Sequence, residues 1–408
     1  MNLSGYENET RRHFSPKGLF GGIPARLSGR RAYAVTASAF VVLVTALPAR
    51  AADLPVLDPS VTKHDMDHDM NDHAPIPAGL FGGSMVAAGK FMFSYTPMFM
   101  RMEDNYIGTS KVSPDFIATK VPLVPPVSMS MGMGMPMMMN NYRIVPTSMD
   151  VQSNMLHAMY GVTDWLNVMV MGSYLEKSMT MTTYSGAMGT TIRGTSTSDT
   201  SGFGDTMVTS LWRLYQDPIH HLHLNIGLSL PSGSTTENTT MLSPMGGLMT
   251  MRGNYGMQLG TGTVDFMPGA TYTGHINQWS WGAAYRGRYA LDDNSEGYHY
   301  GQYSELSGWG GYTWIPGVTT TGRVVGSIQG HIEGSDPLIS GVMQGSNPLF
   351  YGGKRIDLLG GIELDGGPLG FGKNFHLAIE GGAPVYQDLN GPQLGSAWQL
   401  TVAARVGF

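Results

Sequence analysis

The carboxy-terminal segment, Trp398 to Phe408, constrains the fold of this chain more than any other stretch. Its side chains alternate between apolar and polar along the whole segment. The even positions carry the apolar set: Trp398, Leu400, Val402, Ala404, Val406 and Phe408. The odd positions carry Gln399, Thr401, Ala403, Arg405 and Gly407. This alternation is typical of a transmembrane β-strand that has lipid on one face and water on the other, so it predicts a membrane β-barrel.

The last residue, Phe408, indicates where such a barrel assembles. A terminal aromatic in an alternating strand resembles the signal that the bacterial outer-membrane assembly machinery recognises. The sequence therefore predicts the outer membrane of a Gram-negative bacterium as the location. Outer-membrane lipid and, through Phe408, the assembly machinery are the expected partners.

Composition agrees with a barrel and excludes several other classes. Only 13% of the residues are charged, yet no apolar run is long enough for a mature membrane helix. Cysteine is absent, which excludes disulfides and thiolate metal sites and suits a chain that crosses an oxidising periplasm unfolded. The formal charge of -6 is too small to indicate nucleic acid as a partner.

The amino-terminal part predicts a leader and a short tail. Arg30-Arg31, the apolar stretch Ala32 to Leu47 and the small-residue site ending at Ala51 predict a signal peptide over residues 1–51. Residues 52–83 are rich in Pro and Asp and show no apolar periodicity, so we interpret them as a mobile tail or a partial plug.

The tail concentrates side chains that bind transition metals. These are His64, Met66, His68, Met70 and His73, interleaved with aspartates. Imidazole and thioether groups are borderline-to-soft ligands, so the tract would bind copper, nickel or zinc weakly. The alternative is a solvated linker, and the sequence leaves both open.

We predict that residues 84–408 form the barrel, because segments in which apolar and polar residues alternate recur along them. The expected strands are Lys90 to Met102, Ser153 to Val162, Trp165 to Tyr174, Asp205 to Tyr215, His221 to Leu230, Thr261 to Gly274, Gln278 to Leu291, Gly301 to Trp314, Gly317 to Ile332, Lys354 to Leu364, Asn374 to Val385 and the terminal strand. We predict an all-β, antiparallel up-and-down barrel of about twelve strands, with roughly ten to fourteen allowed. An even number keeps both ends in the periplasm.

The connections between these strands alternate in length. Those at 162–165 and 215–219 are tight, whereas 103–150, 178–203, 232–260 and 333–353 are long and rich in Gly, Ser, Thr and Met. Short turns of such barrels face the periplasm and long loops face outward. We expect the same orientation here.

Methionine is the anomaly of the composition, with 31 residues. Within the predicted strands it lies on the polar face, where leucine substitutes would not be expected, together with histidines. The predicted lumen residues are Met98, Met100, Met102, Met155, His157, Met159, Met169, Met171, Met207, His221 and His223. A denser cluster in the first long loop contains Met129, Met131, Met133 and Met135, which we count with the tail as candidate metal ligands.

Three interpretations of a thioether-lined lumen stay open. Thioethers bind Cu(I) or Ag(I), so a soft metal ion is one expected cargo, and stepped sites would let it enter and leave. Methionine is also flexible and polarisable and would line a path for small aromatic or hydrocarbon molecules. In the third interpretation, methionine only packs a narrow, partly plugged interior.

Several segments resemble a known family. They are Lys90 to Met102, Val145 to Met149, Met155 to Trp165, Ser201 to Asp205 and Gly227 to Gly233. Together they resemble the outer-membrane barrel "transporter" family that is labelled as a component of the MetA pathway of phenol degradation. The resemblance covers most of the mature chain. It implies a β-barrel and the passage of hydrophobic compounds, and it carries over no catalytic or binding residues.

These observations predict a channel or facilitator for a small solute. The sharper hypothesis is a soft metal ion, copper or silver, moving along the Met/His wall. The alternatives are small hydrophobic or aromatic compounds and a non-conducting surface scaffold whose long loops bind a partner. No nucleophile elbow, phosphate loop or His-Glu-x-x-His motif is present, so we expect no enzymatic activity and no required cofactor.

Overall fold

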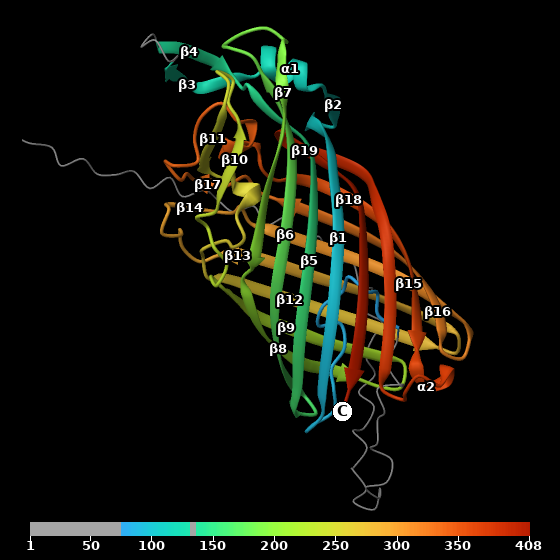
Figure 1. Ribbon diagram of the computed structural model, residues 1–408. Helices are drawn as coiled ribbons and strands as arrows, with labels where there is room; N and C mark the ends of the chain where they lie inside the picture. Colours follow the sequence, from blue (N-terminus) through green and yellow to red (C-terminus); the bar gives the residue numbers. More distant parts are fainter. Residues whose placement is uncertain (1–74, 131–135) are drawn as a thin grey trace, which may run out of the picture. The chain divides into compact units, whose positions relative to one another are not determined.

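Eleven labelled strands form the wall of a closed antiparallel barrel in the computed structural model, which describes residues 75–130 and 136–408 (Figure 1). The wall strands are β1 (Phe91–Gly108), β5 (Ile144–Thr163), β6 (Leu166–Tyr184), β8 (Thr206–Gln216), β9 (His220–Leu230), β12 (Asp265–Ile276), β13 (Trp279–Ala290), β15 (Tyr303–Ile315), β16 (Val318–Gln329), β18 (Gly353–Asp365) and β19 (Phe375–Gly407). Pairing of β19 with β1 closes the barrel. Two further strands, β2 (Ser110–Val112) and β7 (Ile192–Phe203), extend the sheet.

The last strand, β19, covers two passes of the barrel. Residues 376–389 pair antiparallel with β18, and residues 389–407 pair antiparallel with β1. Nine antiparallel pairings lead from β1 round to β18, so these two strands run in opposite directions. One straight strand cannot be antiparallel to both, so the chain turns back near Leu389. Ten single strands and the two limbs of β19 give twelve passes, the even number that the sequence predicts.

The faces of the strands follow the predicted alternation. On β9, Leu224, Ile226 and Leu228 are exposed on the outside, whereas His223 and Asn225 are buried inside. On the last limb of β19, Trp398 and Phe408 are exposed and Thr401 and Ala403 are buried. A closed barrel has no unpaired strand edge, and an apolar outer face can contact lipid tails. The chain is therefore an outer-membrane barrel, as the alternation predicts.

The tight turns are held by local hydrogen bonds. In the turn between β8 and β9, Asp217 Oδ1 accepts hydrogen bonds from the backbone N–H groups of Ile219, at 2.8 Å, and His220, at 2.6 Å. The Tyr215 hydroxyl donates to the other carboxylate oxygen at 2.7 Å. The bond from Tyr215 and the two backbone bonds lower the pKa of Asp217 to about 2, because all three favour the charged form.

Three wall strands run into the segments that the sequence predicts as long loops. β1, β5 and β6 extend past the expected strand ends at Met102, Ser153 and Tyr174. The remaining loop residues fold into a cap at the end opposite the chain's carboxy terminus (Figure 1). The cap contains α1 (Pro114–Lys120), β3 (Pro122–Ser130), β4 (Pro136–Asn141), β10 (Asn238–Leu242), β11 (Leu248–Arg252), η2 (Tyr255–Met257), β14 (Tyr298–His299), β17 (Glu333–Gly334), η3 (Gln344–Ser346) and η4 (Pro348–Phe350).

Methionine explains how the cap acquires a core without long apolar runs. Seven methionines are buried where the cap joins β5 and β6: Met139, Met149, Met179, Met181, Met241, Met257 and Met343. Flexible thioether side chains fill irregular gaps between short elements. Arg143 is fully buried beside them and donates hydrogen bonds to five backbone oxygens, including those of Ala118 and Gly189. These bonds tie α1 to the loop after β6.

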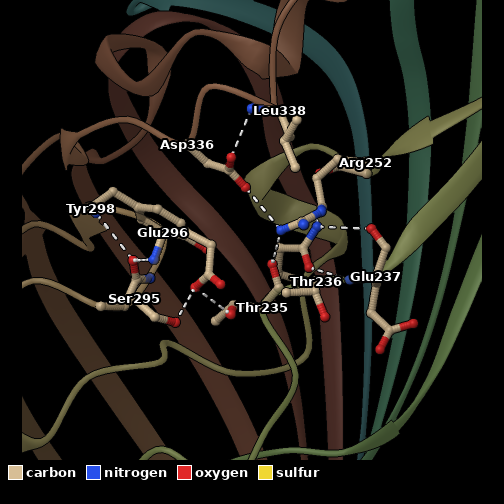
Figure 2. A network of polar contacts seen from close by, with 12 residues as sticks. Thr235, Thr236, Glu237, Arg252, Ser295, Glu296, Tyr298, Asp336 and Leu338 are labelled. Carbon is tan, nitrogen blue, oxygen red and sulfur yellow. Dashed lines mark hydrogen bonds and ion pairs between the residues drawn. The ribbon is translucent and has the colours of Figure 1, made fainter.

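A polar network joins three loops of the cap (Figure 2). Arg252 Nη1 lies 3.0 Å from Asp336 Oδ2 and donates to the backbone oxygen of Thr235 at 3.3 Å. The Thr235 hydroxyl donates to Glu296 Oε2 at 2.8 Å. Residues 235, 252, 296 and 336 come from three separate loops, so the network holds the loops to one another.

Helix is scarce in the described residues. Besides α1, the only α-helix there is the four-residue α2 (Gly366–Leu369), in the turn between β18 and β19. No helix in this part of the chain has the length and apolar character that a membrane span requires.

Candidate functional site

The inner wall of the barrel has two chemically different halves. One half, on β12 to β19, is lined by ion pairs. Arg286 Nη2 lies 2.5 Å from Glu305 Oε1, and Arg355 Nε lies 2.9 Å from Asp357 Oδ2. Each of these carboxylates is more than nine-tenths buried. Buried charges are stable only when paired, so this half is a polar surface whose charges are already neutralised.

The other half, on β1, β5, β6, β8 and β9, carries the methionines and histidines singled out in the sequence. Met155, His157, Met159, Met169, Met171 and His223 are buried on the inner face. Met98, Met100, Met102, Met207 and His221 are half-buried. Met98, Met100 and Met102 face Ser153, Val151 and Met149 across the β1–β5 pair, and Met207 faces Met171 across the β6–β8 pair. Of this set, Met159 and Met169 share one buried cluster, whereas Met102 packs against the cap cluster. The role of the set in a lumen stays a prediction.

Of the predicted metal ligands, only Met129 lies in the described residues. His64, Met66, His68, Met70 and His73 lie outside the described residues, as do Met131, Met133, Met135 and the whole predicted signal peptide. Met129 lies on β3 and packs against the methionine core of the cap. No group of three or more His, Asp or Glu side chains in the described ranges is placed to hold a metal ion. The metal roles of these residues stay predictions.

Residues 75–86, which we call the inner segment, lie against the inner wall. Ile76, Ala78, Leu80, Met85 and Val86 are all buried. These five side chains come from the end of the stretch that the sequence leaves open as a tail or partial plug, and from the first residues of the predicted barrel. The segment precedes β1 and contacts side chains on several strands of the wall.

Apolar contacts hold the inner segment to both halves of the wall. Ile76 and Leu80 pack with Ala284 and Trp309. Ala78 packs with Ala378 and Ala403 on the two limbs of β19. On the methionine half, Met85 and Val86 cluster with Met92, Met159, Met169 and Leu211. Buried methionine on the wall therefore contacts apolar side chains of the segment.

Polar contacts fix the segment's backbone. Arg405 donates hydrogen bonds to the backbone oxygens of Ile76 and Pro77, both at 3.2 Å. The backbone N–H of Gly79 donates to Glu380 Oε2 at 3.0 Å. His223 Nε2 lies 2.9 Å from the backbone oxygen of Gly82. The segment contains turns and no strand, so most of its buried backbone groups have no ladder partner, and these wall side chains form hydrogen bonds with several of them.

One aromatic ring of the segment bridges the two halves. The centroid of the Phe81 ring lies 4.9 Å from that of His157, on the methionine half, and 5.7 Å from Arg286 Cζ on the ion-pair half. A guanidinium at this distance from an aromatic ring is attracted by the ring's quadrupole.

Gly79 must be glycine for the segment to lie so close to the wall. A Cβ atom at this position would lie 2.5 Å from Arg323 Nη2 and 2.9 Å from Glu380 Oε2. Both side chains are buried and paired with each other, so neither can move aside cheaply. A side chain at position 79 would separate the segment from the carboxylate that binds its backbone.

Sequence reasoning missed the side chains of the segment that do this packing. Ile76, Ala78 and Leu80 alternate with Pro77 and Gly79, a period-two pattern of five residues. This pattern was the available signal, but it is too short and too rich in Pro and Gly to predict a strand.

Comparisons with known proteins agree on a barrel and give no family. No protein-family model matches the chain, and no curated protein matches its sequence. Among solved structures, an outer-membrane channel from Pseudomonas putida F1 has a TM-score of 0.49 at 13% identity, covering 81% of this chain and 99% of that one. The toluene transporter TodX of P. putida has a TM-score of 0.39 at 10% identity, covering 79% and 91%. The toluene transporter TbuX of Ralstonia pickettii has a TM-score of 0.39 at 12% identity, covering 79% and 90%.

All three TM-scores are below 0.5, so these proteins say nothing about the cargo of this chain. The barrel that the family resemblance implies is present. Membership of the phenol-degradation family stays a prediction, because no family model matches.

Proposed function

We propose that this chain is an outer-membrane channel for small apolar molecules, including aromatic ones, and that the inner segment must move for them to pass. The proposal rests on the apolar side chains of the inner segment that pack against the wall. Met92, Met159, Met169 and Leu211 of the wall pack directly against Met85 and Val86 of the segment. A wall that accommodates these side chains offers the same apolar contacts to a solute that replaces them.

Several methionine sulfurs already accept hydrogen bonds from asparagine side chains, which favours apolar cargo over a soft metal ion. The Met159 sulfur accepts a hydrogen bond from Asn167 Nδ2 at 3.4 Å, and its side chain is packed among apolar neighbours. In the cap, Asn254 Nδ2 donates to the sulfurs of Met343, at 3.1 Å, and Met179, at 3.5 Å. These thioethers serve packing and hydrogen bonding. The passage of copper or silver stays a prediction without structural support.

Uptake by whole cells tests the proposal. Cells that express the chain are expected to take up radiolabelled toluene faster than cells carrying the empty vector. Removal of residues 75–86 is expected to increase the rate further, because it clears the lumen. A labelled pentose serves as the hydrophilic control and should enter the intact channel slowly. If expression changes the uptake of neither compound, the non-conducting scaffold is the better interpretation.

A further inference from the structure

A cavity of about 200 Å³ lies between the inner segment and the wall. It is at the end of the barrel where the short turns lie, because Gly317 and Thr319, beside the β15–β16 turn, form part of its lining. The inner segment contributes Ile76, Met85 and Val86 to one side. A cavity of about 150 Å³ lined by apolar side chains suffices to bind benzene, so this one can hold a single ring with a small substituent.

The opposite side of the cavity is polar and carries one ion pair and one histidine that lies beside a carboxylate. Glu363 Oε1 lies 4.0 Å from Arg405 Nη1, and His376 Nδ1 lies 4.0 Å from Asp365 Oδ1. All four side chains line the cavity. Each carboxylate already has a basic side chain beside it, so we expect neither a cation nor an anion to be the ligand that this set of groups prefers.

One atom of each pair has no partner. Glu363 Oε2 and His376 Nε2 are buried and make no hydrogen bond to any described residue. A buried polar atom without a partner costs about 1–3 kcal/mol, so a molecule in the cavity that forms hydrogen bonds with both atoms would be stabilised.

The strand register places Glu363 and His376 near each other on one face of the β18–β19 pair. Asp365 on β18 lies directly opposite His376 on β19, and Glu363 is two residues earlier on the same face of β18. Glu363 and His376 are therefore diagonal neighbours, whose side chains lie within reach of one small group. A carboxylate oxygen accepts a hydrogen bond, and His376 Nε2 donates one in the tautomer or charged form that carries a proton on Nε2. A hydroxyl both donates and accepts, so one hydroxyl can satisfy both atoms.

We propose that this cavity binds small, neutral, apolar molecules that carry a hydroxyl group. The hydroxyl donates to Glu363 Oε2 and accepts from His376 Nε2, while the apolar body packs against Met85, Val86 and Met92. The inference rests on the proposed function, because it names the solutes that the channel holds best. It also makes the inner segment part of the site, since Ile76, Met85 and Val86 close the cavity.

Binding of two matched probes to the purified, full-length barrel in detergent tests the proposal. Benzyl alcohol and toluene share a ring and a one-carbon substituent and differ by a hydroxyl. Benzyl alcohol is expected to bind about tenfold more tightly, the effect of one to two good hydrogen bonds. Calorimetry or ligand-observed NMR gives both dissociation constants. Benzoate and benzylamine extend the series and are expected to bind more weakly than benzyl alcohol.

Two substitutions and one control locate the site. Glu363→Leu and His376→Phe each remove one of the two partners, and each is expected to lower the ratio of the two affinities to about threefold while toluene binding persists. Ser307→Ala is the control. Its hydroxyl is also buried and without a hydrogen-bond partner among the described residues, but it does not line the cavity. This variant should keep the wild-type ratio. If one of the first two variants does not fold, the other still gives the result.

Equal binding of benzyl alcohol and toluene by the wild-type barrel would overturn the inference, since water would then satisfy the two atoms. An unchanged ratio in both variants would overturn it as well. These results are separate from those of the uptake experiment. If cells take up toluene but the barrel shows no preference for the alcohol, the proposed channel stands and the proposed site is rejected. If the barrel prefers the alcohol but cells take up no toluene, the site stands and the channel is rejected.

Discussion

Arg323 and Glu380 form a doubly hydrogen-bonded ion pair inside the barrel, with Arg323 Nε donating to Glu380 Oε1 at 2.8 Å and Nη2 donating to Oε2 at 2.7 Å. The two side chains are only 4% and 3% exposed, so water contributes little to their solvation. The same Glu380 Oε2 accepts the backbone N–H of Gly79. The pair therefore links the stability of the wall to the position of the inner segment.

Replacing Glu380 by Ala should both destabilise the barrel and loosen the inner segment. The substitution leaves Arg323 buried without its partner, which typically costs about 3–5 kcal/mol of unfolding free energy. It also removes the acceptor of the Gly79 N–H group. We expect unfolding at lower denaturant concentration and faster cleavage of residues 75–86 by an added protease, both measured on the purified barrel.

Asp357→Ala is the matched control for this prediction. It breaks the pair of the half-buried Arg355 and the buried Asp357, which forms no described hydrogen bond with the inner segment, so a smaller loss of stability is expected than for Glu380→Ala. We expect a loss of stability without faster cleavage of residues 75–86. Equal cleavage in the two variants would show that Glu380 does not hold the segment.

A disulfide can test whether the inner segment blocks the channel. Ala78 packs with Ala403, and the chain has no native cysteine, so Ala78→Cys with Ala403→Cys introduces the only thiols. If this pair closes under oxidation, as neighbouring side chains of this size permit, toluene uptake is expected to fall to the empty-vector rate. Reductant should restore it.

The two single-cysteine variants control for the substitutions themselves and should respond to neither oxidant nor reductant. Wild-type uptake by the oxidised double variant, with the disulfide verified by mass, would mean that solutes pass without displacement of the segment.

The strands of the wall were predictable because lipid and water impose one side-chain pattern on all of them. The expected strand His221 to Leu230 is β9 (His220–Leu230), and the terminal strand has the predicted exposed and buried faces. A shift of one residue would place every apolar side chain inside, so the parity of a transmembrane strand is fixed by its sequence.

The cap and the inner segment were not predictable in the same way. Their structure depends on contacts between residues far apart in the sequence, such as the five hydrogen bonds from Arg143 to backbone oxygens of two separate segments. No periodic pattern in the sequence predicts such contacts. The packing of Met159 and Met169 against Val86 and Leu211 follows only from the path of the inner segment.

Substitution of Met159 distinguishes packing from chemistry. This side chain is 1% exposed and lies in the cluster with Met85 and Val86. Met159→Ala should cost about 2–5 kcal/mol of unfolding free energy because it leaves a cavity, whereas Met159→Leu should cost less than about 1.5 kcal/mol. Denaturant titration of the purified barrel measures both.

The combined replacement of Met98, Met100, Met155 and Met169 by Leu applies the same contrast to transport. For apolar cargo we expect toluene uptake close to wild type, since leucine preserves the apolar surface. If thioethers instead bind a soft metal ion, the quadruple variant should lose any effect of the chain on copper or silver sensitivity. A large drop in toluene uptake by the folded variant would contradict the apolar route.

Phe408 should matter for assembly more than for the stability of the finished barrel. Its ring is 64% exposed on the outer face and contacts Phe93 edge-on, with ring centroids 6.1 Å apart. Its backbone forms two hydrogen bonds with Phe91, from Phe408 N at 2.9 Å and to Phe408 O at 3.2 Å, which close the seam between β19 and β1. Phe408→Ala keeps these backbone bonds and removes only an exposed ring, so the unfolding free energy of refolded protein should fall by no more than about 1 kcal/mol.

If the terminal aromatic is the signal that the assembly machinery recognises, the amount of folded barrel in the outer membrane should fall several-fold, as measured by quantitative blotting of membrane fractions. Phe93→Ala removes the other ring of the contact and leaves the terminus intact, so it should assemble normally. Similar losses in both variants would assign the effect to the ring contact at the seam.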